Sequence, residues 1–565
     1  MTARGKRKKS APWPATMALG DFLVAYLQRA GVSHIFGLPG DLALGLYHRF
    51  GAARGLEIVS FSHEPTVGFA ADGYARSTRR LGVLCVTYGA GGHNVVNAVA
   101  GSYAEQVPLL VISGGPGDAE QKIAKIHHQV KDVEAQCRIF DELTCTAQIV
   151  QQPELAAQQI HDVISRIMSE MRPGYLEIHR DRVDERIPIP RALRDWDGRF
   201  PRPRSDSRKL AEAVSETTDR LRSARKPLLV GGVELYREHG EQYLVALAEK
   251  MGAPVVSTML AKGVFPMDHP LHMGIDMGSF SHPEIRKRVR EADLVLALGA
   301  QRTDLNLGAS RVAVGPERAI WALDHRVEIS NHEYSGVNVR DFAAGLAAAK
   351  YKRRRERVRY YDNLKPPAPR AKKRALTIND MLVELNEFLS DRPGYDVVAE
   401  SGDSLFGGLE LRVPAPGLYL AQGYYASMGF AIPAAMGLQI GSGRRPLVLC
   451  GDGGFQMTGP DISHAPRLGL APLVVLVDNG GWGIFRPVTP RQEQLDLPRW
   501  PYAELAQAWG GTGFQAGTRD ELHAALRAAD EVQGFALVEC RLGTDDLSPI
   551  SRRYIRASAK KARVA

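Results

Sequence analysis

The feature that most limits the fold of this 565-residue chain is a series of unbroken aliphatic runs of strand length. Such runs occupy residues 81–87, 108–113, 226–232, 292–299, 445–451 and 471–479. A strand that is apolar on both faces must be covered on both faces, as in a parallel sheet flanked by helices. Helical patterns lie between the runs, for example at 95–105 and 206–224. The chain is therefore predicted to form α/β domains with doubly wound parallel sheets.

Two stretches that are rich in proline and charged residues, 186–205 and 351–374, divide the chain into three parts. Both stretches have the composition of linkers, because proline and charged residues are disfavoured in a packed core. We expect domains at 17–185, 206–350 and 375–550, linkers at 186–205 and 351–374, and basic tails at 1–16 and 551–565.

The net charge of +9 has its origin at the two ends of the chain. The first ten residues carry five basic side chains and the last fifteen carry six, and neither stretch contains an acidic residue. Both tails lack the apolar residues that would order them, so we expect solvated extensions and no nucleic-acid partner. A composition of 44% hydrophobic and 24% charged residues is that of a folded globular protein.

Targeting and redox signals point to the cytoplasm. The N-terminal residues lack the apolar segment of a secretory signal, and the sequence contains no run of about 18 apolar residues that would predict a membrane span. Five cysteines occur, none in a C-x-x-C pair, and three lie in strand-like apolar runs. We expect buried free thiols in a reducing compartment.

The strongest local motif is G-D-G-G-F at 451–455, which directly follows an aliphatic run and precedes a helical pattern. The glycines, Gly451, Gly453 and Gly454, let backbone N–H groups approach phosphate oxygens. Asp452 would repel a phosphate unless a divalent cation such as Mg²⁺ bridged the two. Asn479 follows the next aliphatic run, so adjacent parallel strands would bring both side chains to one sheet edge.

This G-D-G motif with an asparagine 27 residues beyond the aspartate resembles the diphosphate and magnesium motif of thiamine diphosphate enzymes. The resemblance extends over nearly the whole chain and implies pyrimidine-binding, central and diphosphate-binding domains. It implies that Asp452 and Asn479 bind Mg²⁺ through their side chains and Gly481 through its carbonyl. Asp478 stands where an asparagine is more usual, which leaves the metal affinity open.

The same resemblance assigns the remaining cofactor contacts. Glu64, in S-H-E-P-T, matches the carboxylate that hydrogen-bonds N1′ of the aminopyrimidine and so promotes removal of the C2 proton of the thiazolium. The A-S-M-G-F segment supplies Ala426 and Met428, of which Met428 matches the apolar residue that holds the cofactor bent. From the sequence alone, Glu64 could equally be a helix N-terminal charge, and Met428 could be a core residue.

Asp41, in G-L-P-G-D, together with the adjacent His127 and His128, is similar to the 2-oxo acid decarboxylase branch, which includes pyruvate, indolepyruvate and phenylpyruvate decarboxylases. That branch must protonate a carbon and release an aldehyde, and a carboxylic acid and imidazoles can supply protons near neutral pH. We expect Asp41 and His128 nearest the reacting carbon, with His127 supporting them.

One catalytic carboxylate of the branch is missing. Its usual glutamate, six residues beyond the metal-binding asparagine, falls at Phe485, which cannot transfer a proton. Asp304 ends the segment 292–304, which begins with an aliphatic run. It is the candidate replacement, since strand ends face the site in α/β sheets. The alternative, a loop aspartate that forms a turn, stays equally open.

The substrate pocket is expected to be large and apolar. Leu305 and Leu405 stand where pyruvate-specific members tend to carry aromatic rings, and the pocket is completed by Trp482, Ile484 and Phe485. The resemblance therefore implies decarboxylation of a bulky 2-oxo acid (phenylpyruvate, indolepyruvate or a long or branched-chain acid) to an aldehyde and CO₂ by a homodimer or dimer of dimers. In such a dimer Glu64, Asp41 and the histidines come from one subunit and the metal site from its partner.

Two other functions stay possible from the sequence. A carboligase of the acetolactate-synthase type would use the same cofactor but join the substrate to a second carbonyl compound. A non-catalytic paralogue with nucleic-acid-binding tails would explain Phe485 and the eleven terminal basic residues, although it would have no use for Glu64, Asp452 and Asn479.

Overall fold

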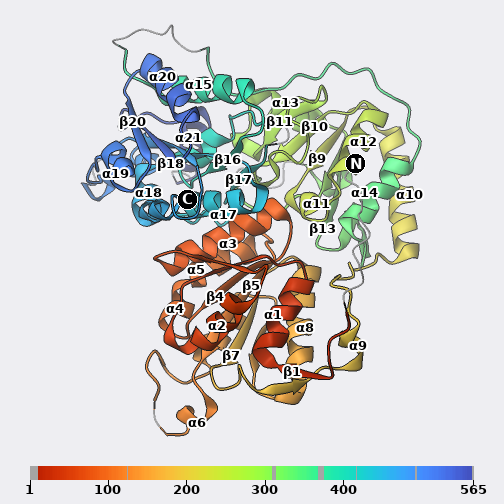
Figure 1. Cartoon of the computed structure of the whole chain (residues 1–565). Helices are drawn as coiled ribbons and strands as arrows, with labels where there is room; N and C mark the ends of the chain where they lie inside the picture. The colour runs from red at the N-terminus through yellow and green to blue at the C-terminus, as the bar shows by residue number, and fades with distance from the viewer. Residues whose placement is uncertain are drawn as a thin grey trace. The chain divides into compact units, whose positions relative to one another are not determined.

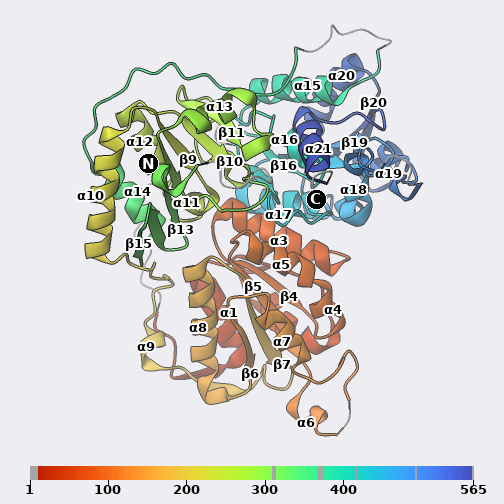
Figure 2. The same cartoon turned by 180° about the vertical axis from the view of Figure 1, so that it is seen from behind.

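The computed structural model describes residues 11–123, 125–307, 314–366, 374–414, 417–489 and 493–562. The chain divides into two compact units, Met1–Arg202 and Pro203–Ala565. Each unit is an α/β structure (Figures 1 and 2), which confirms the predicted class.

The first unit contains a six-stranded parallel sheet. Its strands follow in the order β3 (Glu57–Ser60), β2 (His34–Gly37), β4 (Gly82–Val86), β5 (Leu109–Gly115), β7 (Gly174–His179) and β6 (Ala147–Val150). Its helices are α1 (Leu19–Arg29), α2 (Leu44–Ala52), α3 (Glu64–Thr78), α4 (Ala90–Asn94), α5 (Val96–Ala104), α6 (Asp118–Gln121), α7 (Ala135–Asp141), α8 (Pro153–Glu170) and α9 (Arg191–Arg194).

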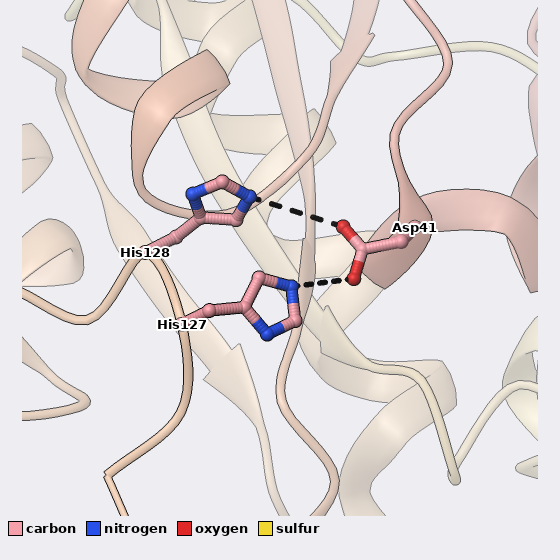
Figure 3. A group of neighbouring side chains, drawn as sticks. All are labelled: Asp41, His127 and His128. Carbon is pink, nitrogen blue, oxygen red and sulfur yellow. Dashed lines mark hydrogen bonds and ion pairs between the residues drawn. The ribbon is translucent and has the colours of Figure 1, made fainter.

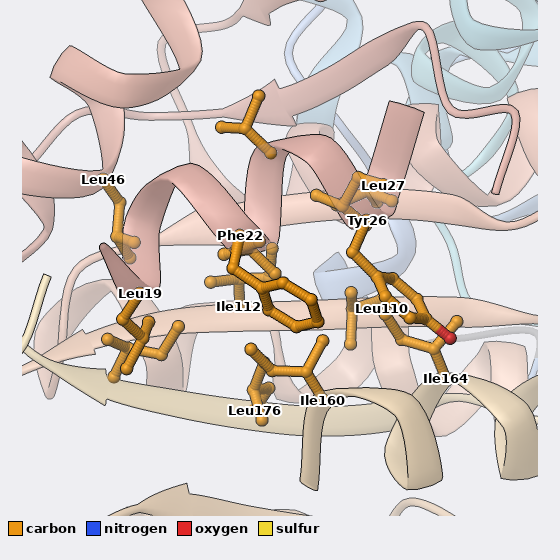
Figure 4. Close-up of a cluster of buried hydrophobic side chains, with 14 of the residues drawn as sticks. Leu19, Phe22, Tyr26, Leu27, Leu46, Leu110, Ile112, Ile160, Ile164 and Leu176 are labelled. Atoms are coloured by element: carbon orange, nitrogen blue, oxygen red, sulfur yellow. The ribbon is translucent and has the colours of Figure 1, made fainter. Parts of the chain in front are cut away.

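Helices α1 and α8 cover one face of this sheet and form a core with it. Phe22 and Tyr26 of α1 and Ile160 of α8 meet Ile112 of β5 and Leu176 of β7 (Figure 4). All five side chains are fully buried. Burial of large apolar side chains of this kind contributes about 1.5–3 kcal/mol each, so this layer fixes the strands whose ends carry the site.

The edge of the first unit differs from the predicted boundaries. Strand β1 (Thr16–Ala18) pairs antiparallel with β8 (Arg186–Pro188). Trp13 is buried against Phe22, and its backbone N–H donates to the carbonyl of Arg194. The prediction of a solvated tail up to residue 16 and of a linker from residue 186 is therefore wrong for these segments, because strand pairing and buried apolar side chains such as Trp13 and Ile187 hold them. Residues 1–10 of the predicted tail lie outside the described residues.

The second unit contains two sheets, and the one formed by residues 227–335 is mixed. Its order is β11 (His272–Asp276), β10 (Val255–Thr258), β9 (Pro227–Gly231), β12 (Leu294–Leu298), β13 (Ala319–Leu323), β14 (Arg326–Ile329) and β15 (His332–Ser335). The last two strands are antiparallel, unlike the predicted parallel sheet. Asp324 and His325 between β13 and β14 both have positive φ, the geometry of a tight two-residue hairpin that twists with its strands.

The other sheet of this unit is six-stranded and wholly parallel. Its order is β17 (Tyr419–Ala421), β16 (Asp396–Ala399), β18 (Pro446–Gly451), β19 (Leu473–Asp478), β21 (Ala536–Arg541) and β20 (Thr512–Ala516). The helices of the unit are α10 (Ser207–Ser223), α11 (Val233–Arg237), α12 (Glu241–Met251), α13 (Pro283–Glu291), α14 (Val339–Ala348), α15 (Ile378–Asp391), α16 (Asp403–Gly408), α17 (Ala431–Ser442), α18 (Asp452–Thr458), α19 (Tyr502–Ala508), α20 (Arg519–Asp530) and α21 (Pro549–Ala562).

Helix α21 contradicts the predicted solvated tail at 551–565 in its first part, up to Ile555, where its side chains pack. Ile550 and Ile555 are buried, and the ring of Tyr554 stacks on Phe406 with centroids 5.2 Å apart. The apolar residues spaced along one face of the segment outweigh its basic ones, because the charged side chains can stay in water while the apolar face packs.

All five cysteines are free thiols, as predicted. Cys137 is partly buried, and the other four, Cys85, Cys145, Cys450 and Cys540, are buried. Burial raises the pKa of the Cys85, Cys137 and Cys145 thiols to about 12. No helix among the described residues has the length and apolar character needed to cross a bilayer.

Candidate active site

Asp452 is held at the carboxyl end of β18 by three backbone N–H groups. Its Oδ1 accepts from Gly453 N at 2.9 Å, and its Oδ2 accepts from Gly480 N at 2.8 Å and Gly481 N at 2.9 Å. The residue is 3% exposed. Burial raises the pKa of this carboxyl to about 6, although the backbone N–H groups oppose the rise. A cation placed here would compensate the buried negative charge.

Asn479 lies at the same sheet edge, as the spacing predicted. Strands β18 and β19 are parallel neighbours, with Gly451 opposite Val477. Asn479 is buried, and its Oδ1 accepts from Gly481 N at 3.3 Å. Gly481 has a φ of +148°, which side-chain-bearing residues rarely adopt. The structure thus brings Asp452, Asn479 and Gly481 together.

Two close approaches explain the glycines of the G-D-G-G motif. A Cβ at Gly453 would lie 2.1 Å from the ring of Trp482, and one at Gly454 would lie 2.5 Å from the side chain of Glu400. One carboxylate oxygen of Asp478 is buried and has no hydrogen-bond partner among the described residues, while its other oxygen accepts from Arg499 at 3.0 Å. Oxygen donors beside a glycine turn, without room for larger residues, fit a hard cation and a diphosphate.

A cavity of about 240 Å³ in the second unit joins the predicted cofactor and substrate residues. Thirteen of the predicted residues line it: Leu305, Leu405, Ala426, Met428, Gly451, Asp452, Gly453, Gly454, Asn479, Gly481, Trp482, Ile484 and Phe485. They come from segments that follow β12, β16, β17, β18 and β19. The carboxyl ends of parallel strands meet at one edge, which is where α/β sheets bind ligands.

The sequence interpretation missed part of the cavity lining. Ser401, Gly402, Asp403 and Ser404 line it after β16, and Tyr554 reaches it from α21. A polar turn with glycine directly after the apolar strand at 396–399 was a usable signal, since G-D-G-G has the same context. Tyr554 had no local signal, because only tertiary packing brings α21 to the site.

Asp41, His127 and His128 form a group in the first unit (Figure 3). His127 Nε2 lies 2.6 Å from Asp41 Oδ2, and His128 Nε2 lies 4.0 Å from Asp41 Oδ1. Burial alone would raise the pKa of the Asp41 carboxyl, but the hydrogen bond and charge of His127 lower it overall. The predicted trio is therefore assembled, with His127 in the closer contact.

Glu64 begins α3 at the carboxyl-end side of the same sheet. Its Oε2 accepts a 2.8 Å hydrogen bond from the Nδ2 of Asn94, the last residue of α4. Asn94 was not identified from the sequence, because its role depends on a contact 30 residues away. The amide fixes the direction of the Glu64 carboxylate and leaves its Oε1 for another partner.

Asp304 does not line the cavity that Leu305 borders. Its side chain is exposed, and its Oδ1 accepts from the backbone N of Leu305 at 2.9 Å. Residues 304–307 form a turn, which agrees with the alternative that the sequence left open.

Family models for thiamine pyrophosphate enzymes match the N-terminal binding domain at residues 17–137, the central domain at 214–343 and the C-terminal binding domain at 400–540. Fold and site together define a thiamine diphosphate-binding enzyme of three α/β domains.

Curated relatives narrow this class. The chain is 34% identical to the indole-3-pyruvate decarboxylase of Azospirillum brasilense over 96% of this chain and 99% of that protein. It is 31% identical to pyruvate decarboxylase 3 of Oryza sativa subsp. japonica (95% and 93% covered) and to pyruvate decarboxylase 4 of Arabidopsis thaliana (95% and 91%). The chain belongs to the thiamine diphosphate-dependent 2-oxo acid decarboxylase family, which confirms the resemblance seen in the sequence.

Proposed function

We propose that this enzyme converts a 2-oxo acid with a bulky apolar side chain into an aldehyde and CO₂, with thiamine diphosphate and Mg²⁺. One observation carries the proposal: a single cavity has Asp452 and Asn479 at its polar part and Leu305, Leu405 and Ile484 in its wall. The similarity to a relative named as an indole-3-pyruvate decarboxylase supports it.

The residues of the second unit fit the cofactor. Asp452 and Asn479 would hold Mg²⁺ through oxygen atoms and Gly481 through its carbonyl, while Gly453 and Gly454 let the turn lie directly against Trp482 and Glu400, where no larger residue fits. Met428 lines the cavity and would support the cofactor from an apolar side. Bound thiamine diphosphate would supply the electron sink for the electron pair that stays on the substrate carbon when CO₂ leaves.

Residues of the first unit would carry out the proton transfers. Glu64, directed by Asn94, would hold a proton at N1′ of the aminopyrimidine. The lowered pKa of Asp41 keeps its carboxylate ionised at neutral pH, where its Oδ2 orients His127 through the Nε2 at 2.6 Å. We place Asp41 and His128 nearest the reacting carbon and His127 in support, and we assign proton delivery to the imidazole of His128, which the ionised Asp41 faces at 4.0 Å.

The apolar wall favours a large substrate. An aryl side chain buries about 150–250 Å², which corresponds to about 4–6 kcal/mol at about 25 cal/mol per Å². The methyl group of pyruvate gains far less. Phenyl, indolyl and branched aliphatic side chains all satisfy this argument.

A panel of 2-oxo acids, assayed for CO₂ and aldehyde with added thiamine diphosphate and Mg²⁺, tests the proposal. We expect kcat/KM for phenylpyruvate or indolepyruvate to exceed that for pyruvate at least about tenfold. Leu305→Phe should lower kcat/KM for the bulky acids and spare pyruvate, which serves as the matched control. A majority of acyloin over aldehyde from a single 2-oxo acid would replace this proposal with a carboligase.

The assembly and location follow from the same proposal. A homodimer or dimer of dimers would bring Glu64 of one subunit to Asp452 of its partner. Five free thiols, four of them buried, support a reducing cytoplasmic location.

A further inference from the structure

A chain of buried polar side chains lies in the core of the first unit, apart from the buried group formed by Asp72, Arg76 and Glu105. Tyr175, Glu177 and His179 alternate along β7, and Gln136 lies on α7. Gln136, Tyr175 and Glu177 are fully buried, and His179 is nearly so. Burying polar groups is unfavourable unless each is hydrogen-bonded, so such a chain contributes little as a means of stabilising a core.

The hydrogen bonds of this chain have one direction. Tyr175 OH donates to Glu177 Oε2 at 2.5 Å, and Gln136 Nε2 donates to Tyr175 OH at 2.7 Å and to Ser113 Oγ at 2.9 Å. Both N–H groups of the Gln136 amide are thus directed into the core. Its Oε1 must therefore face the opposite way, where it accepts from Gly89 N at 2.7 Å.

The far end of the chain is a histidine that lies between two carboxylates. His179 Nε2 lies 3.6 Å from Glu177 Oε1, and His179 Nδ1 lies 2.6 Å from Asp118 Oδ1. Burial lowers the pKa of His179, but the neighbouring carboxylates of Glu177 and Asp118 raise it overall. The hydrogen-bonded part of the network therefore runs from Glu177 Oε2 through Tyr175 to Gln136, and the His179–Glu177 contact is electrostatic.

Gly89 lies between the two groups that we propose to transfer protons, the Asp41–histidine group and the Asn94–Glu64 pair. Its φ is +68°, and a Cβ there would lie 2.3 Å from the carbonyl oxygen of His128. His128 itself has a φ of +69°, an unfavourable conformation for a histidine that its surroundings must impose. Gly89 also precedes α4, whose last residue, Asn94, binds Glu64.

Gln136 also contacts α4 directly below its first turn. A Cβ at Gly92 would lie 2.2 Å from Gln136 Oε1, so the backbone of α4 rests on this amide. Loss of the amide would leave Gly89 N without its acceptor and allow the start of α4 to move. Both His128 and Asn94 would shift with it.

We propose that Gln136 is a positioning residue for the active site: its amide, anchored by Tyr175 and Glu177, fixes Gly89 and thereby sets the His128 loop and the Asn94–Glu64 pair. The inference rests on the proposed decarboxylation for its kinetic readout. Gln136 itself contacts neither Glu64 nor the Asp41 group by any described bond, so its effect acts through Gly89.

The experiment compares four variants of the full-length enzyme. Gln136→Met keeps the length of the side chain and removes the acceptor; Tyr175→Phe removes the anchor and keeps the amide; the third variant combines both. Ile160→Ala, in α8 of the same core, is the control for general loss of stability. Each is measured for kcat, KM and melting temperature at saturating thiamine diphosphate and Mg²⁺, for cofactor Kd by calorimetry, and for amide hydrogen exchange.

We expect Gln136→Met to lower kcat about 10- to 100-fold, the size of effect produced by a displacement of about 1 Å at a catalytic group, with cofactor Kd changed less than about threefold. Tyr175→Phe should lower kcat less, and the double variant should match Gln136→Met, because both substitutions act through one contact. Hydrogen exchange should accelerate at residues 89–95 and 126–130. Ile160→Ala should lower the melting temperature and keep kcat.

Wild-type kcat in Gln136→Met, unchanged exchange at 89–95, or losses that add in the double variant would each overturn the positioning role. Failure of the wild-type enzyme to decarboxylate any 2-oxo acid would instead overturn the proposed function. In that case the exchange measurement alone decides whether Gln136 fixes Gly89.

Discussion

Asp452 illustrates how a single buried carboxylate can be prepared for a metal ion. Three backbone N–H groups hold its two oxygens at the end of β18. Its orientation is therefore fixed by the protein backbone, and less conformational entropy is lost when an ion binds. Asn479 is fixed through Gly481 in the same way.

Glu64 allows a test at a single atom. Glu64→Gln keeps an oxygen that can accept from Asn94 but cannot exchange a proton with the aminopyrimidine. We expect turnover to fall at least about 100-fold, within the usual range for removal of a general acid or base, while cofactor binding persists. Steady-state kinetics and calorimetry measure the two quantities. Unchanged turnover would reduce Glu64 to a helix-terminal charge.

Asp304 gives the opposite kind of test. Asp304→Asn retains the acceptor for Leu305 N, so the turn should survive. If this carboxylate replaces the one absent at Phe485, kcat should fall about 10- to 100-fold with the melting temperature unchanged. Wild-type kinetics would assign Asp304 to the turn alone.

At this scale the sequence identified residues that directly follow strands, because a parallel sheet brings all its carboxyl ends to one edge. Asp452 and Asn479 were found in this way, whereas Leu405 was found through the family resemblance. Asn94, Gln136 and Tyr554 were not, since each acts through a contact made only when separate parts of the chain fold together.

Among the elements, β16 and α17 are joined by one buried carboxylate. Glu400, directly after β16, accepts from Ser401 N at 2.8 Å and from Ala431 N, the first residue of α17, at 2.9 Å. Burial raises its pKa to about 7, although these backbone bonds oppose the rise. The start of α17, next to Met428, is thus tied to the end of a strand that borders the cavity.

The raised pKa makes stability depend on pH. Between about pH 4.5 and 7 the folded state binds a proton at Glu400 more readily than the unfolded state, so its contribution is full below pH 4.5 and is lost as the pH rises through 7. Glu400→Gln removes this dependence. We expect the melting temperature of the variant, relative to wild type, to increase between pH 5 and 8. A difference that is constant across this range would contradict the shift.

The long elements were predictable and the short ones were not. The run at 81–87 became β4 (Gly82–Val86), and the run at 471–479 became β19 (Leu473–Asp478), because fully apolar runs fold as buried strands. Strands β1 and β8 have only three residues each, too few for a periodic pattern. Helix α21 was obscured by its charge, although its apolar face decided the outcome.

For the whole molecule, the proposed dimer predicts complementation between inactive subunits. Co-expression of Glu64→Gln and Asp452→Asn chains yields heterodimers with one doubly altered and one intact site, provided that each site combines two subunits. Random assortment then gives roughly a quarter of wild-type activity. Each variant expressed alone is the control. No recovery in purified heterodimer would show that Glu64 and Asp452 act within one chain.

The buried thiols make unfolding visible without any added probe. Because burial keeps the cysteines of the folded state protonated, an alkylating reagent should modify them mainly in molecules that have unfolded in part. Cys85, Cys137 and Cys145 lie in the first compact unit, and Cys450 and Cys540 lie in the second. A brief pulse of reagent followed by mass spectrometry would therefore show which unit unfolds first. Three labels would indicate the first unit, and two labels would indicate the second.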